Sequence, residues 1–275
     1  MTIGECLRWA KARLPADSAH LEAHLLLEHV SGLGRTTLYA WPERELEQVT
    51  IRQFQSLVQQ RCEGTPIAYL LGQREFYGLT LRVDERVLIP RPETELLVDV
   101  ALEHTLESQA KVLDLGTGSG AIALALASQR PDWSICATDQ SDDALAVAKV
   151  NKENLGVQNV EFYRSDWFAS IPPTRFDLIV SNPPYVEPDS EFLQQGDVRF
   201  EPINALVAPN HGLADLLAII EAAPSYLKAG GFIWLEHGYQ QAEQLRECLT
   251  ELGYRGAVTH CDLQGLDRVT GAQWP

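Results

Sequence analysis

The sequence predicts an α/β protein in which a small all-helical domain precedes a mostly parallel sheet covered by helices on both faces. Residues 2–63 carry apolar side chains at helical spacing. From about Glu93 onward, short apolar runs alternate with helical stretches, which is the pattern of repeated βα units. Several of these runs end in Gly, Asp or Asn, the kind of residue expected where an open α/β sheet binds its ligand.

The order of these patterns divides the chain into three parts. We expect residues 1–75 to form the helical domain. Pro15 and Pro42 interrupt its helical runs and so mark boundaries between separate helices. Residues 76–88 alternate in polarity and contain a glycine, so we expect a β-hairpin linker. Residues 89–275 form the α/β domain, with late strands near 232–236, 257–259 and 268–270.

A glycine-rich turn follows the first expected strand of the sheet, at residues 111–115. The turn consists of Gly116, Thr117, Gly118, Ser119 and Gly120, and a helical pattern over 121–129 comes next. Such a turn lets a nucleotide-like ligand approach bare backbone at a helix start. The spacing also fits a dinucleotide site, but the carboxylate of Asp114 would repel a pyrophosphate and suits an ammonium group. S-adenosylmethionine therefore fits this turn better than a dinucleotide.

Acidic residues end the next two expected strands. Asp139 follows the run 133–138, where a carboxylate can accept both ribose hydroxyls of an adenosyl group, although it also suits a helix entry. Asp166 ends the run 160–165, where it can accept the exocyclic amine of adenine, and the ring of Trp167 can cover the base. Together with Asp114, these residues form the expected cofactor site.

The most informative motif is Ser-Asn-Pro-Pro-Tyr, directly after the apolar run 176–180. Asn182 offers a side-chain oxygen and Pro183 a backbone carbonyl, so a planar –NH₂ group can donate one hydrogen bond to each. Both residues precede a proline and are restricted to extended geometry, which fixes the two acceptors in advance. Pro184 and the Tyr185 ring complete the expected substrate site, and Asn182 also faces the cofactor. Taken alone, the motif also suits a rigid loop that leaves a strand.

These motifs resemble the class I S-adenosylmethionine-dependent methyltransferases that modify a planar nitrogen. Further segments resemble the protein-(glutamine-N5) methyltransferases that act on class 1 peptide chain release factors; they lie at residues 66–72, 76–78, 87–95, 201–202 and 205–206. One departure is the segment 207–212, where a turn richer in glycine and aspartate is expected.

This resemblance implies a Rossmann-like, mostly parallel seven-stranded sheet. It also implies that the methyl group goes to the glutamine side chain of a Gly-Gly-Gln motif in release factors, with S-adenosylhomocysteine as the product. A methyltransferase core needs no helical domain to bind its cofactor, so residues 1–75 are expected to recognise the protein substrate. We expect Asn182, Pro183 and Tyr185 to be the catalytic residues.

Two other substrates remain compatible with the motifs. A ribosomal-protein glutamine methyltransferase would share the chemistry and most of the residues, and a nucleic-acid N-methyltransferase would use the same Asn-Pro-Pro-Tyr motif with a flipped base. The net charge of −16 disfavours nucleic acid as a partner, because phosphate binding normally requires a basic face.

Composition predicts a cytoplasmic enzyme without a membrane segment or metal. No long apolar stretch occurs, and the charged residues Glu5, Arg8 and Lys11 argue against a signal peptide. The five cysteines are scattered, which suits reduced thiols better than a disulfide or zinc framework.

Overall fold

The computed structural model describes residues 1–104, 108–171 and 173–275 and divides the chain into two compact units. The helical unit contains Met1–Gln73 together with the short segment Gln195–Phe200. The sheet unit contains Arg74–Gln194 and Glu201–Pro275. The helical unit thus takes in six residues that lie in the middle of the sheet unit's sequence.

Helices alone build the first part of the helical unit. They are α1 (Ile3–Lys11), α2 (Ala19–Ser31), α3 (Arg35–Ala40), α4 (Gln48–Cys62) and α5 (Ile67–Leu71). The N-terminus of α1 carries a reciprocal capping box, in which Thr2 accepts from the Glu5 backbone N–H and the Glu5 side chain accepts from the Thr2 backbone N–H. The apolar stripes meet in a core centred on Leu26, Leu27 and Phe54. The predicted helical N-terminal region is confirmed.

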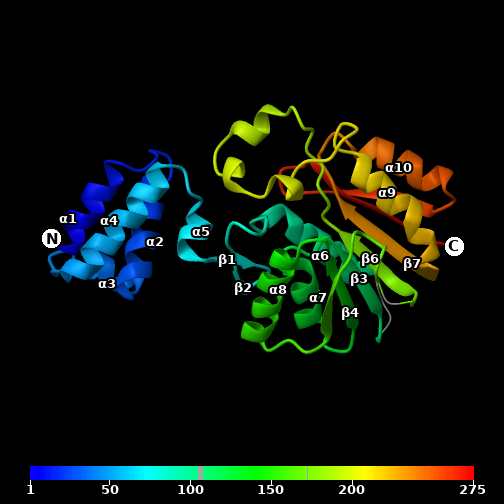
Figure 1. Cartoon of the computed structure of the whole chain (residues 1–275), viewed down its shortest axis with the longest axis horizontal. Helices are drawn as coiled ribbons and strands as arrows, with labels where there is room; N and C mark the ends of the chain where they lie inside the picture. Colours follow the sequence, from blue (N-terminus) through cyan, green and yellow to red (C-terminus); the bar gives the residue numbers. More distant parts are fainter. Residues whose placement is uncertain (105–107, 172) are drawn as a thin grey trace. The chain divides into compact units, whose positions relative to one another are not determined.

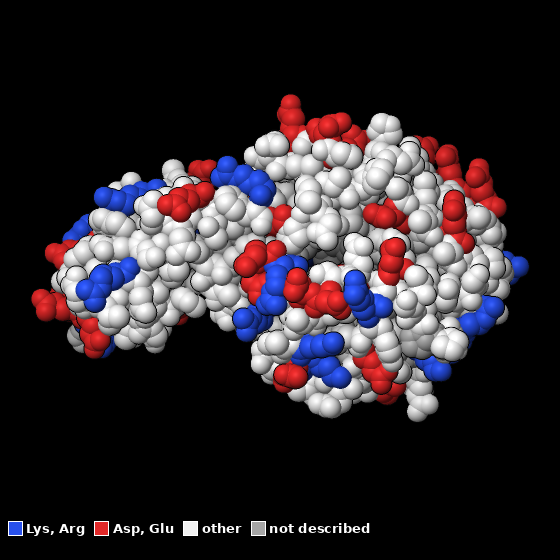
Figure 2. Space-filling model, viewed as in Figure 1, with Lys and Arg blue, Asp and Glu red and all other residues white. Residues whose placement is uncertain are grey.

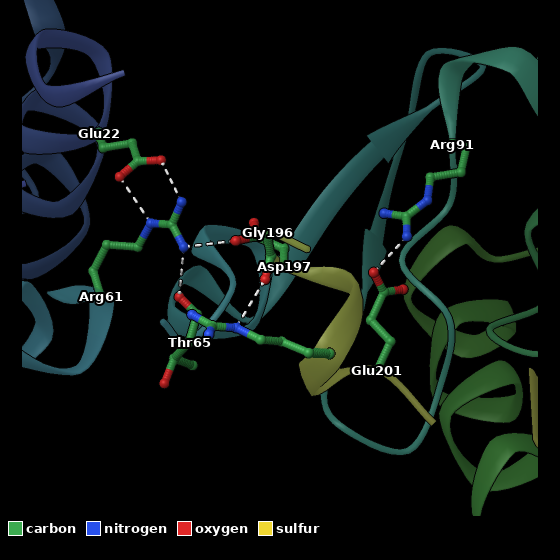
Figure 3. A network of polar contacts seen from close by, with 8 residues as sticks. Glu22, Arg61, Thr65, Arg91, Gly196, Asp197 and Glu201 are labelled. Carbon is green, nitrogen blue, oxygen red and sulfur yellow. Dashed lines mark hydrogen bonds and ion pairs between the residues drawn. The ribbon is translucent and has the colours of Figure 1, made fainter. Parts of the chain in front are cut away.

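A buried arginine holds Gln195–Phe200 within the helical unit. Arg61 on α4 makes two hydrogen bonds with the Glu22 carboxylate, at 2.8 and 2.9 Å, and a third with Asp197 at 2.7 Å (Figure 3). Gly64 leaves room for the Phe200 ring, since a Cβ atom there would lie 2.6 Å from that ring. The segment is therefore fixed by one ion-pair network and one aromatic contact.

The sheet unit is built on seven strands with the order β5-β4-β3-β6-β7-β9-β8 (Figure 1). They are β3 (Lys111–Leu115), β4 (Ser134–Asp139), β5 (Val160–Arg164), β6 (Phe176–Ser181), β7 (Leu227–Glu236), β8 (Arg255–Cys261) and β9 (Asp267–Gln273). All neighbours are parallel except the pairs that involve β9, which runs antiparallel to β7 and β8. The predicted mostly parallel, seven-stranded sheet is confirmed.

Alternate side chains of each strand enter two separate cores. Val112 of β3 packs on one face with α6 (Glu95–His104) and α7 (Ala121–Gln129), while Leu113 packs on the other with α9 (Ala214–Ala222) and α10 (Ala242–Glu251). Helix α8 (Asp142–Leu155) packs on β4 and β5. Because both faces are covered, ligands can reach the sheet only at the strand ends.

A two-stranded hairpin opens the sheet unit. Its strands are β1 (Gln73–Phe76) and β2 (Leu79–Arg82), which places it earlier than the expected linker at residues 76–88. Tyr77 and Gly78 both have positive φ, 52° and 76°, as a tight two-residue turn requires. The turn therefore falls where the alternating pattern was expected to begin.

Short 3-10 helices occupy the long connections. They are η1 (Pro92–Thr94), η2 (Glu191–Gln194), η3 (Val198–Phe200), η4 (Ile203–Ala205) and η5 (Ala223–Ser225). In the described part of the chain, every helix is too short or too polar to cross a bilayer.

Candidate active site at the carboxyl ends of the strands

A cavity of about 300 Å³ lies within the sheet unit, at the carboxyl ends of the central strands. Its wall includes Gly116, Gly118, Asp139, Asp166, Trp167, Asn182 and Pro184. These residues follow β3, β4, β5 and β6 in turn, so the structure brings four separately predicted strand ends together around one space.

The glycine turn presents bare backbone to the cavity. Gly116, Gly118 and Gly120 all have positive φ, at 69°, 55° and 85°, which residues with a Cβ atom rarely adopt. A Cβ atom at Gly118 would meet no other atom within 4 Å, so the space beside this backbone is open. Gly120 is the N-cap residue of α7, and the side chains of Thr117 and Ser119 are buried. These three residues therefore support the turn and leave its exposed backbone to Gly116 and Gly118.

Asp114 lies beneath the turn and not in the cavity wall. Its side chain is fully buried, Oδ2 accepts a 2.6 Å hydrogen bond from the Thr117 hydroxyl, and Oδ1 has no partner among the described residues. Burial raises the pKa of this carboxyl group to about 7, although the Thr117 hydroxyl opposes the shift. A cation bound above the turn would favour its charged form.

Asp139 is held by backbone groups on two sides. Oδ2 accepts from Gly118 N–H and Oδ1 accepts from Ser141 N–H, both at 2.9 Å. Because a carboxylate has about four acceptor positions, Asp139 keeps acceptor capacity for a ligand in the cavity. Ser141 also caps α8 by accepting from Ala144 N–H. Burial raises the pKa of Asp139, and the backbone hydrogen bonds oppose that effect.

Trp167 closes the cavity beside the glycine turn. Its φ of 43° lies in the left-handed region, and its ring would be 3.4 Å from a Cβ atom at Gly116. The Ser165 hydroxyl donates to the Trp167 carbonyl at 2.8 Å and fixes this strained turn. The Trp167 side chain also hydrogen-bonds to Asp215, and this bond opposes the rise in the pKa of Asp215 that burial causes.

The Asn-Pro-Pro-Tyr segment is anchored by its flanking residues. The Ser181 hydroxyl donates to the Leu115 carbonyl at 2.7 Å, which ties the end of β6 to the end of β3. Asn182 Nδ2 donates to the Thr94 hydroxyl oxygen at 3.2 Å, and the Tyr185 hydroxyl donates to Glu236 at 3.1 Å. Asn182 and Pro184 line the cavity, and Pro183 between them is buried.

The unexpected segment 207–212 packs on this motif. Asn210 and His211 adopt positive φ without being glycine, 54° each. Gly212 follows at 78°, and a Cβ atom there would lie 2.0 Å from the Tyr185 carbonyl oxygen. Asn210 and His211 thus adopt left-handed backbone in a turn that lacks the expected content of glycine and aspartate.

Other wall residues were not expected from the sequence. Asp215, Arg86, Val87 and Asn204 all line the cavity. Asp215 stands in the first turn of α9, and its only local signal is an acidic residue at a helix start.

The cavity rim also depends on one buried ion pair. The Glu201 carboxylate accepts from Ile89 N–H at 3.0 Å and pairs with Arg91, which fixes the segment before η1 (Figure 3). Pro202, directly after Glu201, lines the cavity.

Comparison with known proteins agrees with this site. Residues 5–72 match the family described as PrmC N-terminal domain, and residues 92–197 match the family described as Methyltransferase small domain. The chain is 51% identical to the release factor glutamine methyltransferase of Shewanella oneidensis, over 99% of this chain and 96% of that protein. It is 47% identical to the Escherichia coli protein of the same name, over 96% of each chain.

Among solved structures, the catalytic domain of hMettl16 in complex with an RNA hairpin aligns with a TM-score of 0.60 at 18% identity. The alignment covers 80% of this chain and 82% of that chain. At this identity the likeness concerns the fold alone. The sheet order is that of the class I fold, and the match of residues 92–197 to the methyltransferase family model defines the class of protein as a methyltransferase. The near full-length identities are more specific: the chain belongs to the release factor glutamine methyltransferase family.

Proposed function

We propose that this protein transfers a methyl group from S-adenosylmethionine to the side-chain amide nitrogen of the glutamine in the Gly-Gly-Gln motif of class 1 release factors. The observation that carries the proposal is the position of Asn182, whose carboxamide lies in the wall of the same cavity as the glycine turn and Asp139. The sequence relatives named for release factors support the choice of substrate.

The residues around the cavity fit S-adenosylmethionine. The open backbone at Gly118 accommodates a close ligand, and the remaining acceptor capacity of Asp139 suits ribose hydroxyls. Trp167 and the carboxylates of Asp166 and Asp215 suit an adenine ring and its exocyclic amine. Asp114 is buried next to the turn, and a bound cation would favour the charged form of its carboxyl group.

When bound, S-adenosylmethionine supplies an electrophilic methyl group on a sulfonium. The protein's contribution is to orient the acceptor. Asn182 Oδ1 accepts one N–H of the substrate amide and the Pro183 carbonyl accepts the other, so the nitrogen lone pair is directed at the methyl group. Alignment of two bound reactants lowers a barrier by about 7–11 kcal/mol. No general base is needed, since a methylated amide nitrogen is acidic and loses its proton to water.

The charge distribution supports a protein substrate over nucleic acid. The chain has a net charge of −16, and on the face drawn in Figure 2 the Lys and Arg side chains are scattered among Asp and Glu. Recognition of nucleic acid normally uses a continuous basic patch. The five free cysteines suit a reducing compartment, so we place the reaction in the cytoplasm.

The substrate is tested by incubating the purified protein with labelled S-adenosylmethionine and intact release factor, and by locating the label with mass spectrometry. We expect one methyl group on the glutamine of the Gly-Gly-Gln motif and none on a factor carrying Gly-Gly-Ala. Ribosomal protein and RNA serve as competing acceptors. Label on either of these in place of the release factor would contradict the proposal.

A further inference from the structure

The buried face of Asn182 is in contact with Thr94, the last residue of η1. Thr94 is 4% exposed, and its hydroxyl oxygen accepts the 3.2 Å hydrogen bond from Asn182 Nδ2. A carboxamide has one donating end and one accepting end. With Nδ2 engaged by Thr94, Oδ1 is the end left for the cavity.

Thr94 in turn lies against a buried carboxylate. Glu236, at the end of β7, is 1% exposed and accepts a hydrogen bond from the Tyr185 hydroxyl through Oε1. Burial raises the pKa of Glu236, and the nearby Thr94 hydroxyl opposes this rise. Oε2 of Glu236 is buried and has no hydrogen-bond partner among the described residues, so this carboxyl group keeps acceptor capacity on the side away from Tyr185.

The carboxylate determines which way the hydroxyl points. The Thr94 oxygen accepts from Asn182 Nδ2, and Oε2 of Glu236 is an acceptor without another partner among the described residues, so the Thr94 proton turns toward the carboxyl group and the oxygen lone pairs turn toward Asn182. If Asn182 were rotated by half a turn, its Oδ1 would face those lone pairs and its Nδ2 would face the cavity. A substrate –NH₂ group would then meet a second donor, and one of the two acceptors for the nitrogen would be lost.

We propose that Thr94, anchored by Glu236, is a positioning residue that fixes the Asn182 carboxamide with Oδ1 toward the methyl acceptor. This inference rests on the proposed role of Asn182. Glu236, Thr94 and Asn182 together then select a substrate nitrogen that donates hydrogen bonds. The same Glu236 side chain also holds Tyr185.

The test compares Thr94→Val, which removes the hydroxyl at nearly constant shape, with Thr94→Ser, which keeps it. We expect Thr94→Val to lower kcat for release factor by about tenfold or more, the scale of one lost preorganised contact. KM and the affinity for S-adenosylmethionine should stay near wild type, and Thr94→Ser should keep most of kcat. Glu236→Gln supplies a second variant, because its amide can donate to Thr94 and so release the constraint; a similar fall in kcat is expected.

A double-mutant cycle separates positioning from a general structural effect. In an Asn182→Ala background, Thr94→Val should cause no further loss, because the side chain through which it acts is gone. A loss that is equally large in both backgrounds would overturn the inference, as would wild-type kcat for both Thr94→Val and Glu236→Gln. If Asn182→Ala itself keeps wild-type kcat, the proposed function of Asn182 fails instead, which is a distinguishable result.

Discussion

Asp139 accepts a hydrogen bond from the backbone N–H of Gly118, at 2.9 Å from Oδ2. The end of β4 and the glycine turn after β3 are thereby joined at the point where both line the cavity. A ligand that binds Asp139 therefore meets a carboxylate that is already oriented, and the turn beside it is held in its left-handed conformation.

Removal of this carboxylate should weaken cofactor binding. We expect Asp139→Ala to reduce the affinity for S-adenosylmethionine by about 1.5–3 kcal/mol, the usual value of hydrogen bonds to a charged group. Titration calorimetry measures this directly. Asp142→Ala is the matched control, because Asp142 is exposed and its ion pair with Arg164 lies on the surface. Equal affinities for Asp139→Ala and the control would remove Asp139 from the site.

Asp114 should give the stability of the protein a distinct pH dependence. Burial raises the pKa of this carboxyl group from its ordinary value of 3.8 to about 7 in the folded protein, so the folded state binds an additional proton between these pH values. The contribution of this proton to the free energy of unfolding is fully present below about pH 4 and is lost as the pH rises through 7. Between pH 5 and pH 8, urea unfolding should show a decrease in stability that is larger by about 2–3 kcal/mol in wild type than in Asp114→Asn. Parallel pH profiles for the two proteins would show that Asp114 does not titrate in this range.

The local sequence predicted those site residues whose positions follow from secondary structure. Gly116 and Asn182 come directly after strands, Asp139 ends β4, and Asp166 lies two residues beyond β5; parallel strands bring such ends together whatever the remaining contacts are. Their assignments to cofactor or substrate remain predictions.

The local sequence did not predict the residues that reach the site through long-range contacts. Asp215 reaches Trp167 from the start of α9, and Thr94 reaches Asn182 from a 3-10 helix before α6. Neither stands at a strand end, so no local pattern marks it. For Asp114 the position in β3 was predictable from the sequence. Its complete burial was not, because that depends on how the glycine turn folds over it.

The segment Gln195–Phe200 was also beyond local patterns. Its sequence position suggests the sheet unit, whereas the buried Arg61, already paired with Glu22, binds Asp197 and the Phe200 ring packs at Gly64 in the helical unit. Such an ion pair joins residues far apart in the chain and leaves no periodic signal in either segment.

The helical unit should contribute to recognition of the protein substrate. Tyr39 and Trp41 are 51% and 59% exposed there, and exposed aromatic residues are frequent anchors of protein interfaces. We expect the double variant Tyr39→Ala, Trp41→Ala to lower kcat/KM for intact release factor by about tenfold, with unchanged cofactor affinity. Gln53→Ala, an exposed residue of α4, is the control. A short Gly-Gly-Gln peptide should be an equally poor substrate for all three proteins, and undiminished kcat/KM for the double variant would exclude these side chains from recognition.

The central claim is that Asn182 orients the methyl acceptor, and single-turnover methylation of intact release factor tests it most directly. With saturating S-adenosylmethionine, Asn182→Ala should methylate at a rate at least about a hundredfold below wild type, comparable to the loss of one preorganised hydrogen-bonding group. Its affinity for S-adenosylmethionine, measured on the same preparation, should fall much less. A variant that binds the cofactor normally and still methylates at nearly the wild-type rate would contradict the claim.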